Sequence, residues 1–251
     1  MIYNEYNETL PKEIIQSILE ISLNTNPINF FEEYEQLFFV DKYFNKKCND
    51  NFKKFRKSIN IFRDMFGYNC FKYIKQISEC LNGQFKKIII LDSTAGHFGC
   101  DLFTYIMKKT LSNLIYLLGT SISMPTSFIA PYPQQLDFRN KSVCVIKTYL
   151  TLTGYCLNSD AIKSLLRGND IYYRKSYENH TYHQIQPMTI IISAMDRLDI
   201  MEAKSKLHLD EHDYIVLNIL NILDIKSDPL RDYYFIINQN IMEIKTILNV
   251  V

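Results

Sequence analysis

The feature that most constrains the fold is a strand-like run that leads through a short loop into a helical pattern. The run spans residues 86–92 (KKIIILD), the loop residues 93–101 (STAGHFGCD) and the helical pattern residues 102–111. A β-branched apolar run is typical of a buried strand, and apolar residues at helical spacing are typical of an amphipathic helix. The order of strand, loop and helix is the layout of a phosphate-binding loop in an α/β domain.

The loop lacks the side chains that a working phosphate-binding loop needs. Such a loop reads G-x-x-x-x-G-K-[ST]; its backbone N–H groups hold phosphates, its Lys contacts the β/γ oxygens and its hydroxyl ligates Mg²⁺. Here Thr94 stands at the first Gly, Gly99 at the second, Cys100 at the Lys and Asp101 at the hydroxyl residue. A carboxylate about 4 Å from a phosphate oxygen is repelled by roughly 4 kcal/mol at an effective dielectric constant of ~20. We therefore expect no cofactor and no ATP/Mg²⁺ binding, although Asp101 retains the oxygens to ligate Mg²⁺.

Two downstream segments continue the pattern. Residues 139–148 (RNKSVCVIKT) form a strand-like run, and residues 157–177 (LNSDAIKSLLRGNDIYYRKSY) resemble the form LNxxxIKxLxGGDxIxxRxLY. The positions in step with that form are Lys163, Gly168, Asp170, Arg174 and Tyr177. With the loop, these segments resemble a degenerate ATPase domain of superfamily 3 helicases, of the poxvirus-type primase-helicase kind. The resemblance covers roughly residues 85–200 and implies a three-layer α/β/α, AAA+-like (P-loop NTPase-like) domain.

The same resemblance locates further catalytic positions that have lost their expected side chains. The family has metal-binding acids at the end of the second strand, where this chain has Lys147 and Thr148. It has a polar sensor after the strand 189–193, where this chain has Ala194. For the arginine finger we find only Arg197, which lies too close to the strand end. These losses imply that ATP hydrolysis has been lost.

Helical patterns precede the α/β region. Pro11 and Pro27 stand at the first positions of two candidate helices, where the missing N–H of proline is not needed. Two more helices are expected over residues 51–65 and 68–81, the second ending before an Asn-Gly pair. Family members carry a helical collar ahead of the ATPase core, which agrees with this order.

We therefore expect a helical, collar-like region at residues 1–84, the AAA+-like domain at 85–213 and a C-terminal helical segment at 214–251. In the last, residues 214–220 read as a buried strand or helix, and apolar spacing predicts a final helix over residues 230–248.

A basic stretch near the third expected helix is a candidate nucleic-acid surface. Between residues 42 and 57 basic side chains face the single acid Asp50, with Phe52 and Phe55 among the interleaved aromatics. Basic groups neutralise phosphates and aromatic rings stack on bases. The alternative is a solvated helix face whose aromatics lie in the core. The candidates, with two positions that would face DNA in the family's central hairpin, are Lys46, Lys47, Lys53, Lys54, Arg56, Lys57, Arg174 and Lys175.

One short stretch reads H-x-x-E-H, the inverted zincin pattern, in which two His on one helical face bind Zn²⁺ and Glu acts on a bound water. Its members, His208, Glu211 and His212, are candidate metal ligands, but the surrounding acids favour a charged surface connection and we expect no metal. His180 and His183 form a second pair, which the resemblance places at the hairpin. For His97, in the loop, a local hydrogen bond is favoured over an anion contact.

Composition limits the compartment. No apolar run approaches the ~20 residues that span a bilayer, and the first residues lack the regions of a signal peptide. Six cysteines without C-x-x-C spacing favour buried thiols over a disulfide framework. We expect an intracellular, cytoplasmic protein that does not bind membranes; its Ile, Asn, Lys and Tyr content fits an AT-rich viral coding sequence.

The predicted function is that of a catalytically inactive helicase-like protein, a viral DNA-replication accessory, nucleic-acid-binding or assembly subunit. The resemblance implies DNA, an active helicase or other replication proteins as partners, and ring or homo-oligomeric assembly. Two alternatives remain open. One is a structural or virion protein that kept only the NTPase fold, and the other is a zinc-dependent hydrolase using the H-x-x-E-H residues.

Overall fold

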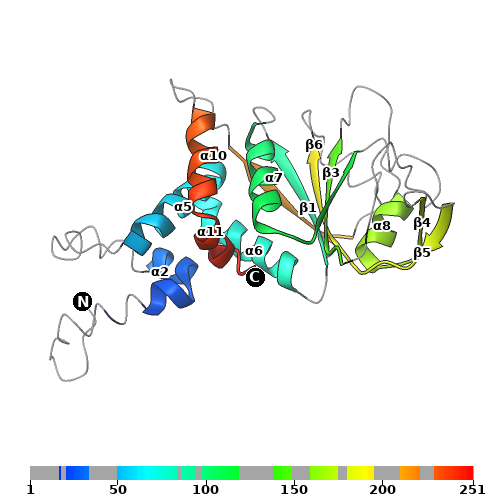
Figure 1. Ribbon diagram of the computed structural model, residues 1–251, viewed down its shortest axis with the longest axis horizontal. Coiled ribbons are helices and arrows are strands. Elements are labelled where there is room, and N and C mark those ends of the chain that lie inside the picture. Colours follow the sequence, from blue (N-terminus) through cyan, green and yellow to red (C-terminus); the bar gives the residue numbers. More distant parts are fainter. Residues whose placement is uncertain are drawn as a thin grey trace.

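A five-stranded parallel sheet lies at the centre of the molecule, with helices on both faces (Figure 1). The computed structural model describes residues 17, 21–33, 50–83, 86–93, 98–118, 138, 140–148, 159–174, 180–194, 210–220 and 229–250. The strands of the sheet are β1 (Ile88–Ser93), β2 (Leu114–Leu118), β3 (Val143–Thr148), β6 (Thr189–Ala194) and β7 (Tyr214–Ile219). Their spatial order is β2-β3-β6-β1-β7, and every neighbouring pair is parallel.

The two faces of the sheet belong to two separate apolar clusters, because successive side chains of a strand point to opposite faces. Ile89 and Leu91 of β1 pack with α7 (Phe98–Thr110) and the helical region, whereas Ile88 and Ile90 pack with α8 (Ser159–Arg167). Figure 1 shows α7 and α8 on opposite sides of the sheet. The expected three-layer α/β/α architecture is confirmed.

A helical region packs beside α7 and draws on both parts of the chain that flank the α/β region. It consists of α2 (Pro27–Glu33), α5 (Asp50–Phe66), the 3₁₀ turn η1 (Gly67–Asn69), α6 (Cys70–Asn82), α10 (Pro229–Gln239) and α11 (Ile241–Ile247). Phe30, Phe62 and Ile74 share its apolar core with Ile237 and Ile244 of the last two helices. The helices expected from Pro27 and over 51–65 and 68–81 are thus present; the one expected from Pro11 lies outside the described residues, apart from residue 17. None of the helices in the described ranges is long and apolar enough to cross a membrane.

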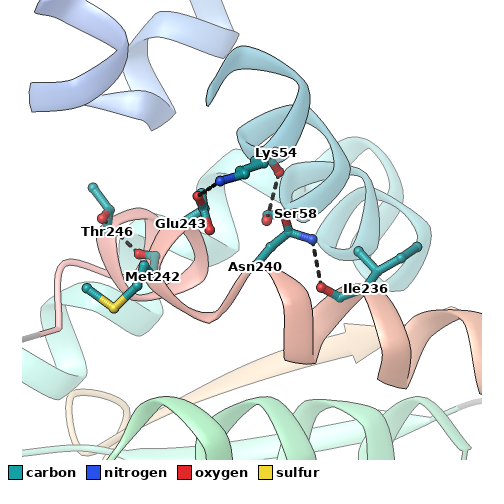
Figure 2. Close-up of polar contacts among 7 residues, drawn as sticks. All are labelled: Lys54, Ser58, Ile236, Asn240, Met242, Glu243 and Thr246. Atoms are coloured by element: carbon teal, nitrogen blue, oxygen red, sulfur yellow. Dashed lines mark hydrogen bonds and ion pairs between the residues drawn. The ribbon is translucent and has the colours of Figure 1, made fainter. Parts of the chain in front are cut away.

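The last helix differs from its prediction as one continuous element over residues 230–248. It is interrupted at Asn240, whose backbone has φ −124° and ψ 33°. The buried Asn240 amide donates to the Ile236 carbonyl, 2.7 Å away, and so stops α10 from within (Figure 2). This agrees with the tendency of Asn side chains to compete for backbone hydrogen bonds.

The apolar run at 214–220 is the strand β7, paired with β1 from Ile88↔Tyr214 to Ser93↔Ile219. The sheet therefore continues past residue 213, where we had expected the α/β domain to end. A short parallel strand and a buried helix segment cannot be distinguished by apolar period alone.

An antiparallel hairpin of β4 (Ile171–Arg174) and β5 (His180–His183) follows α8. It lies at the end of the molecule opposite the helical region (Figure 1). Gly168 ends α8 at φ +74°, and a Cβ there would lie 2.6 Å from Pro187 Cδ. Glycine is therefore needed both for the left-handed turn and for the close approach of Pro187.

Candidate functional site

The carboxyl end of β1 is the place where an α/β sheet of this order offers a ligand site. From β1 the chain passes through α7 to β2 at one edge, whereas from β6 it crosses to β7 on the other side of β1. Ligands of open α/β sheets bind outside the carboxyl ends of strands at such a switch point. The first turn of α7 lies here and carries three of the four loop positions predicted from sequence.

Gly99, at the second glycine of the loop pattern, is buried against β7. A Cβ at this position would lie 2.2 Å from Ile219 Cγ2, closer than two carbon atoms can approach. The absence of a side chain thus lets the start of α7 pack on the fifth strand.

Cys100, at the lysine position, lies in the core and does not face a ligand. Its side chain is 1% exposed and is hydrogen-bonded to Ser193 of β6. Burial, with a smaller contribution from the Asp101 carboxylate, raises the pKa of the Cys100 thiol to about 12. The group is therefore neutral near pH 7 and supplies no positive charge for phosphate.

Asp101 and Lys147, at the hydroxyl and acidic-strand positions, form an ion pair. Lys147 Nζ of β3 lies 2.6 Å from Asp101 Oδ1 of α7. The Lys147 side chain is 31% exposed and the Asp101 side chain is 41% exposed, so the pair is at the surface of the site and partly hydrated. Two positions that the sequence places in different segments are thus joined directly by opposite charges.

The surroundings of the pair are aromatic and acidic. Burial, and secondarily Asp101, raise the pKa of Tyr116 on β2 to about 12 and also raise the pKa of Tyr234 on α10. The Tyr234 ring lies edge-on to that of Tyr105, with centroids 4.5 Å apart. The Asp92 carboxylate at the end of β1 adds to the raised pKa of Cys100. Two further lysines approach these rings, since Lys108 Nζ lies 5.9 Å from the Tyr116 centroid and Lys109 Nζ lies 5.3 Å from the Tyr105 centroid.

The remaining strand-end positions are adjacent in the sheet. Thr148 and Ala194, at the acid and sensor positions, are register partners of β3 and β6, next to the partners Lys147 and Ser193. Several other predicted positions lie outside the described residues, namely Lys46, Lys47, Thr94, His97, Lys175, Tyr177, Arg197 and His208.

The basic stretch on α5 separates into a solvent face and a buried face. Lys53, Lys54 and Lys57 are exposed, whereas Phe52 and Phe55 are buried and unavailable for base stacking. Lys54 Nζ lies 3.9 Å from Glu243 Oε1 of α11 (Figure 2), and the Lys54 side chain is 51% exposed whereas that of Glu243 is 14% exposed. Arg56 is half-buried on the same helix, and Arg174 lies on β4 opposite His180.

The described part of the H-x-x-E-H stretch, residues 210–212, is not helical. Glu211 and His212 are exposed in the turn at residues 211–213 that leads into β7. His180 and His183 stand on β5. Among the residues that the structure describes, no group of His, Cys, Asp and Glu could hold a metal ion.

The pairing of Asp101 with Lys147 is the feature that sequence reasoning missed. From the sequence, the two residues were considered separately, one at the position of the loop hydroxyl and one at the end of a strand. Their opposite charges were the available signal. Only the folded chain shows that the first turn of α7 and the end of β3 bring the two side chains within 2.6 Å of each other.

No protein-family model matches the chain, and no curated protein matches it. Among solved structures, it is similar to the A-form apo structure of the NrS-1 C-terminal region, with a TM-score of 0.50 and 13% identity over 78% of this chain and 45% of that chain. The chain shares an α/β fold with that region. A second similar structure is JCV helicase, with a TM-score of 0.43 and 11% identity over 94% of this chain and 64% of that chain. The chain spans less than two thirds of the length of either structure, and at such identities the likeness concerns the fold alone.

Proposed function

We propose that this helicase-like chain is catalytically inactive and acts as an accessory subunit of viral DNA replication, binding nucleic acid or an active helicase. The observation that carries the proposal is the 2.6 Å ion pair between Lys147 and Asp101. It engages the one carboxylate of the loop that could have replaced the missing hydroxyl as a Mg²⁺ ligand.

Electrostatics make recovery of metal binding at Asp101 unfavourable. A Mg²⁺ ion that displaced Lys147 from Asp101 would remain about 4 Å from an ammonium group. At an effective dielectric constant of ~20 this repulsion is roughly 8 kcal/mol, twice that of two unit charges. The neutral Cys100 thiol offers a triphosphate no compensating attraction.

Binding to DNA is supported by groups away from this edge. Lys53 and Lys57 are exposed on α5, and the β4–β5 hairpin projects from the far end of the molecule (Figure 1). Because Phe52 and Phe55 are buried, we expect α5 to contribute phosphate contacts without base stacking. Binding would then be salt-dependent and insensitive to sequence.

Two titrations test the proposal together. A fluorescent ATP analogue is titrated with and without Mg²⁺, and a fluorescein-labelled oligothymidylate is titrated at low and at physiological salt. We expect no Mg²⁺-dependent nucleotide binding and salt-sensitive DNA binding. The variant Lys53→Gln/Lys57→Gln should weaken DNA binding, whereas Lys72→Gln/Lys108→Gln removes two exposed charges elsewhere and should not.

Each titration can contradict one part of the proposal. Tight Mg²⁺-dependent ATP binding would overturn the assignment of an inactive loop. Absence of binding in both titrations would favour a structural protein that kept only the fold. Stoichiometric zinc in the purified protein, lost on His212→Ala, would instead revive the hydrolase alternative.

A further inference from the structure

A cavity of about 500 Å³ opens at the amino-terminal edge of the sheet, the edge opposite the Asp101–Lys147 pair. It is lined by residues that precede β1, β6 and β7 and by the end of α8. The polar and turn-forming members are Lys86, Lys87, Arg167, Pro187, His212 and Asp213. Neither the loop pattern nor the basic stretch on α5 includes any of them.

The walls of this cavity are held together by backbone hydrogen bonds between segments far apart in sequence. Ile190 N donates to Lys87 O over 3.1 Å, and Ile88 N donates to Asp213 O over 2.8 Å. Met188 N donates to Leu165 O over 2.9 Å, which ties the start of β6 to the end of α8. The close packing of Gly168 on Pro187 fixes the same wall. The charged side chains are therefore presented from a frame that is already formed.

The charge of the lining is one-sided. The lining contains three basic side chains, those of Lys86, Lys87 and Arg167, and one carboxylate, that of Asp213. His212, which also lines the cavity, is exposed. Lys86 Nζ also donates to the Leu81 carbonyl at 3.1 Å, which fixes its position without neutralising it. Among the described residues, neither Lys87 nor Arg167 has an ion-pair partner. This concentration of charge is local, because the whole chain carries a formal net charge of only +1.

We propose that this cavity, hereafter the edge pocket, binds phosphate groups, and that their source is the backbone of single-stranded DNA. Arg167 can engage phosphate oxygens with its planar fork, and the two lysines add point charges. A volume of about 500 Å³ is large enough for a phosphate with its attached sugar. Arg167 also ends the helix that leads through Gly168 into β4, so the edge pocket lies next in sequence to the hairpin strand that carries Arg174. The choice of DNA as the source rests on the proposed function, whereas phosphate binding itself does not.

The test uses the full chain and two probes, a fluorescein-labelled oligothymidylate and inorganic tripolyphosphate. The variant Lys87→Gln/Arg167→Gln should weaken oligonucleotide binding by about tenfold or more, as expected for loss of charge-assisted hydrogen bonds. If both side chains contact phosphates, the slope of log affinity against log salt should fall in magnitude by about 1.4, since each contact to a single strand contributes ~0.7. Lys72→Gln/Lys108→Gln is the charge-matched control and should leave affinity and slope unchanged.

The charge-preserving variant Lys87→Arg/Arg167→Lys separates loss of binding from loss of folding, because it should keep the salt slope. If wild-type protein binds the oligonucleotide and Lys87→Gln/Arg167→Gln binds it with the same affinity and slope, the edge pocket is not the site, although DNA binding stands. Binding of tripolyphosphate alone, abolished in that variant, would support the phosphate site and replace DNA by a free polyphosphate. No binding of either probe would overturn the inference.

Discussion

Lys147 on β3 donates to Asp101 on α7 over 2.6 Å, and so joins a strand of the sheet to the first turn of the helix that follows β1. The two charges neutralise each other at the carboxyl end of the sheet. Either residue alone would leave an unpaired charge at this edge.

The ion pair should contribute modestly to stability. Because both side chains are about a third or more exposed, we expect a coupling energy of about 0.5 kcal/mol, within the usual range of exposed pairs. A double-mutant cycle with Asp101→Asn and Lys147→Gln, measured by urea unfolding, gives this value directly. It should shrink in high salt. A coupling of zero at low salt would mean that the pair is not formed in solution.

Gly99→Ala should destabilise the protein by about 1–3 kcal/mol, the usual cost of forcing an extra carbon into a packed core. The gain in helix propensity, up to ~1 kcal/mol, is smaller than this cost. The matched test is Gly99→Ala in an Ile219→Ala background, which lacks the Cγ2 atom that a Cβ would meet. There the substitution should cost little. An equal cost in both backgrounds would show that the contact with β7 is not the reason for the glycine.

Gly168→Ala should cost more than a left-handed backbone alone requires. Asn140 also has a positive φ, +57°, but is exposed. At that position Ala should be less stable than Gly by about 1–2 kcal/mol, the left-handed penalty. The loss in free energy of unfolding caused by Gly168→Ala should exceed this difference, because the new Cβ would also lie 2.6 Å from Pro187 Cδ. Equal penalties at residues 140 and 168 in urea unfolding would argue against the Pro187 contact.

Stability should fall as pH rises above about 9. Burial raises the pKa of Cys80 to about 11 and that of Cys100 to about 12, from a value of 9.0 in the unfolded chain. In this window the unfolded state loses its thiol protons first, so each thiol favours unfolding by at most about 1.4 kcal/mol per pH unit. The contribution is fully present below pH 9 and is lost towards the folded pKa values. Thermal unfolding between pH 8 and 10 measures it, and Cys100→Ala should show a shallower decline than wild type.

Helices, strands and turns were predicted well where residue type and apolar spacing indicate the same structure. The apolar run before the loop is β1, and the segment 157–177 contains α8, the Gly168 turn and β4 in that order. The start of α7 was less well predicted, because its apolar spacing begins at Leu102 whereas the helix begins at Phe98. Its first turn holds the residues read as loop.

Features that depend on contacts between distant segments could not be read from the sequence. Apolar spacing is continuous through Ile237, Ile241 and Ile244, so the break at Asn240 left no periodic signal. The ion pair depends on the distance between the first turn of α7 and the end of β3. The edge pocket assembles residues that precede different strands, and nothing in their spacing shows that these strands are neighbours.

The helical region is built from both ends of the described chain, since α11 and α5 share one apolar core. A ribosome delivers α2, α5 and α6 long before α10 and α11, and the fifth strand, β7, also emerges late. Phe62 and Ile74 of the early helices are therefore only partly covered until α10 and α11 have been synthesised. A nascent chain released before residue 229 would expose that apolar surface, so truncated products should aggregate or be degraded instead of accumulating as a smaller folded protein.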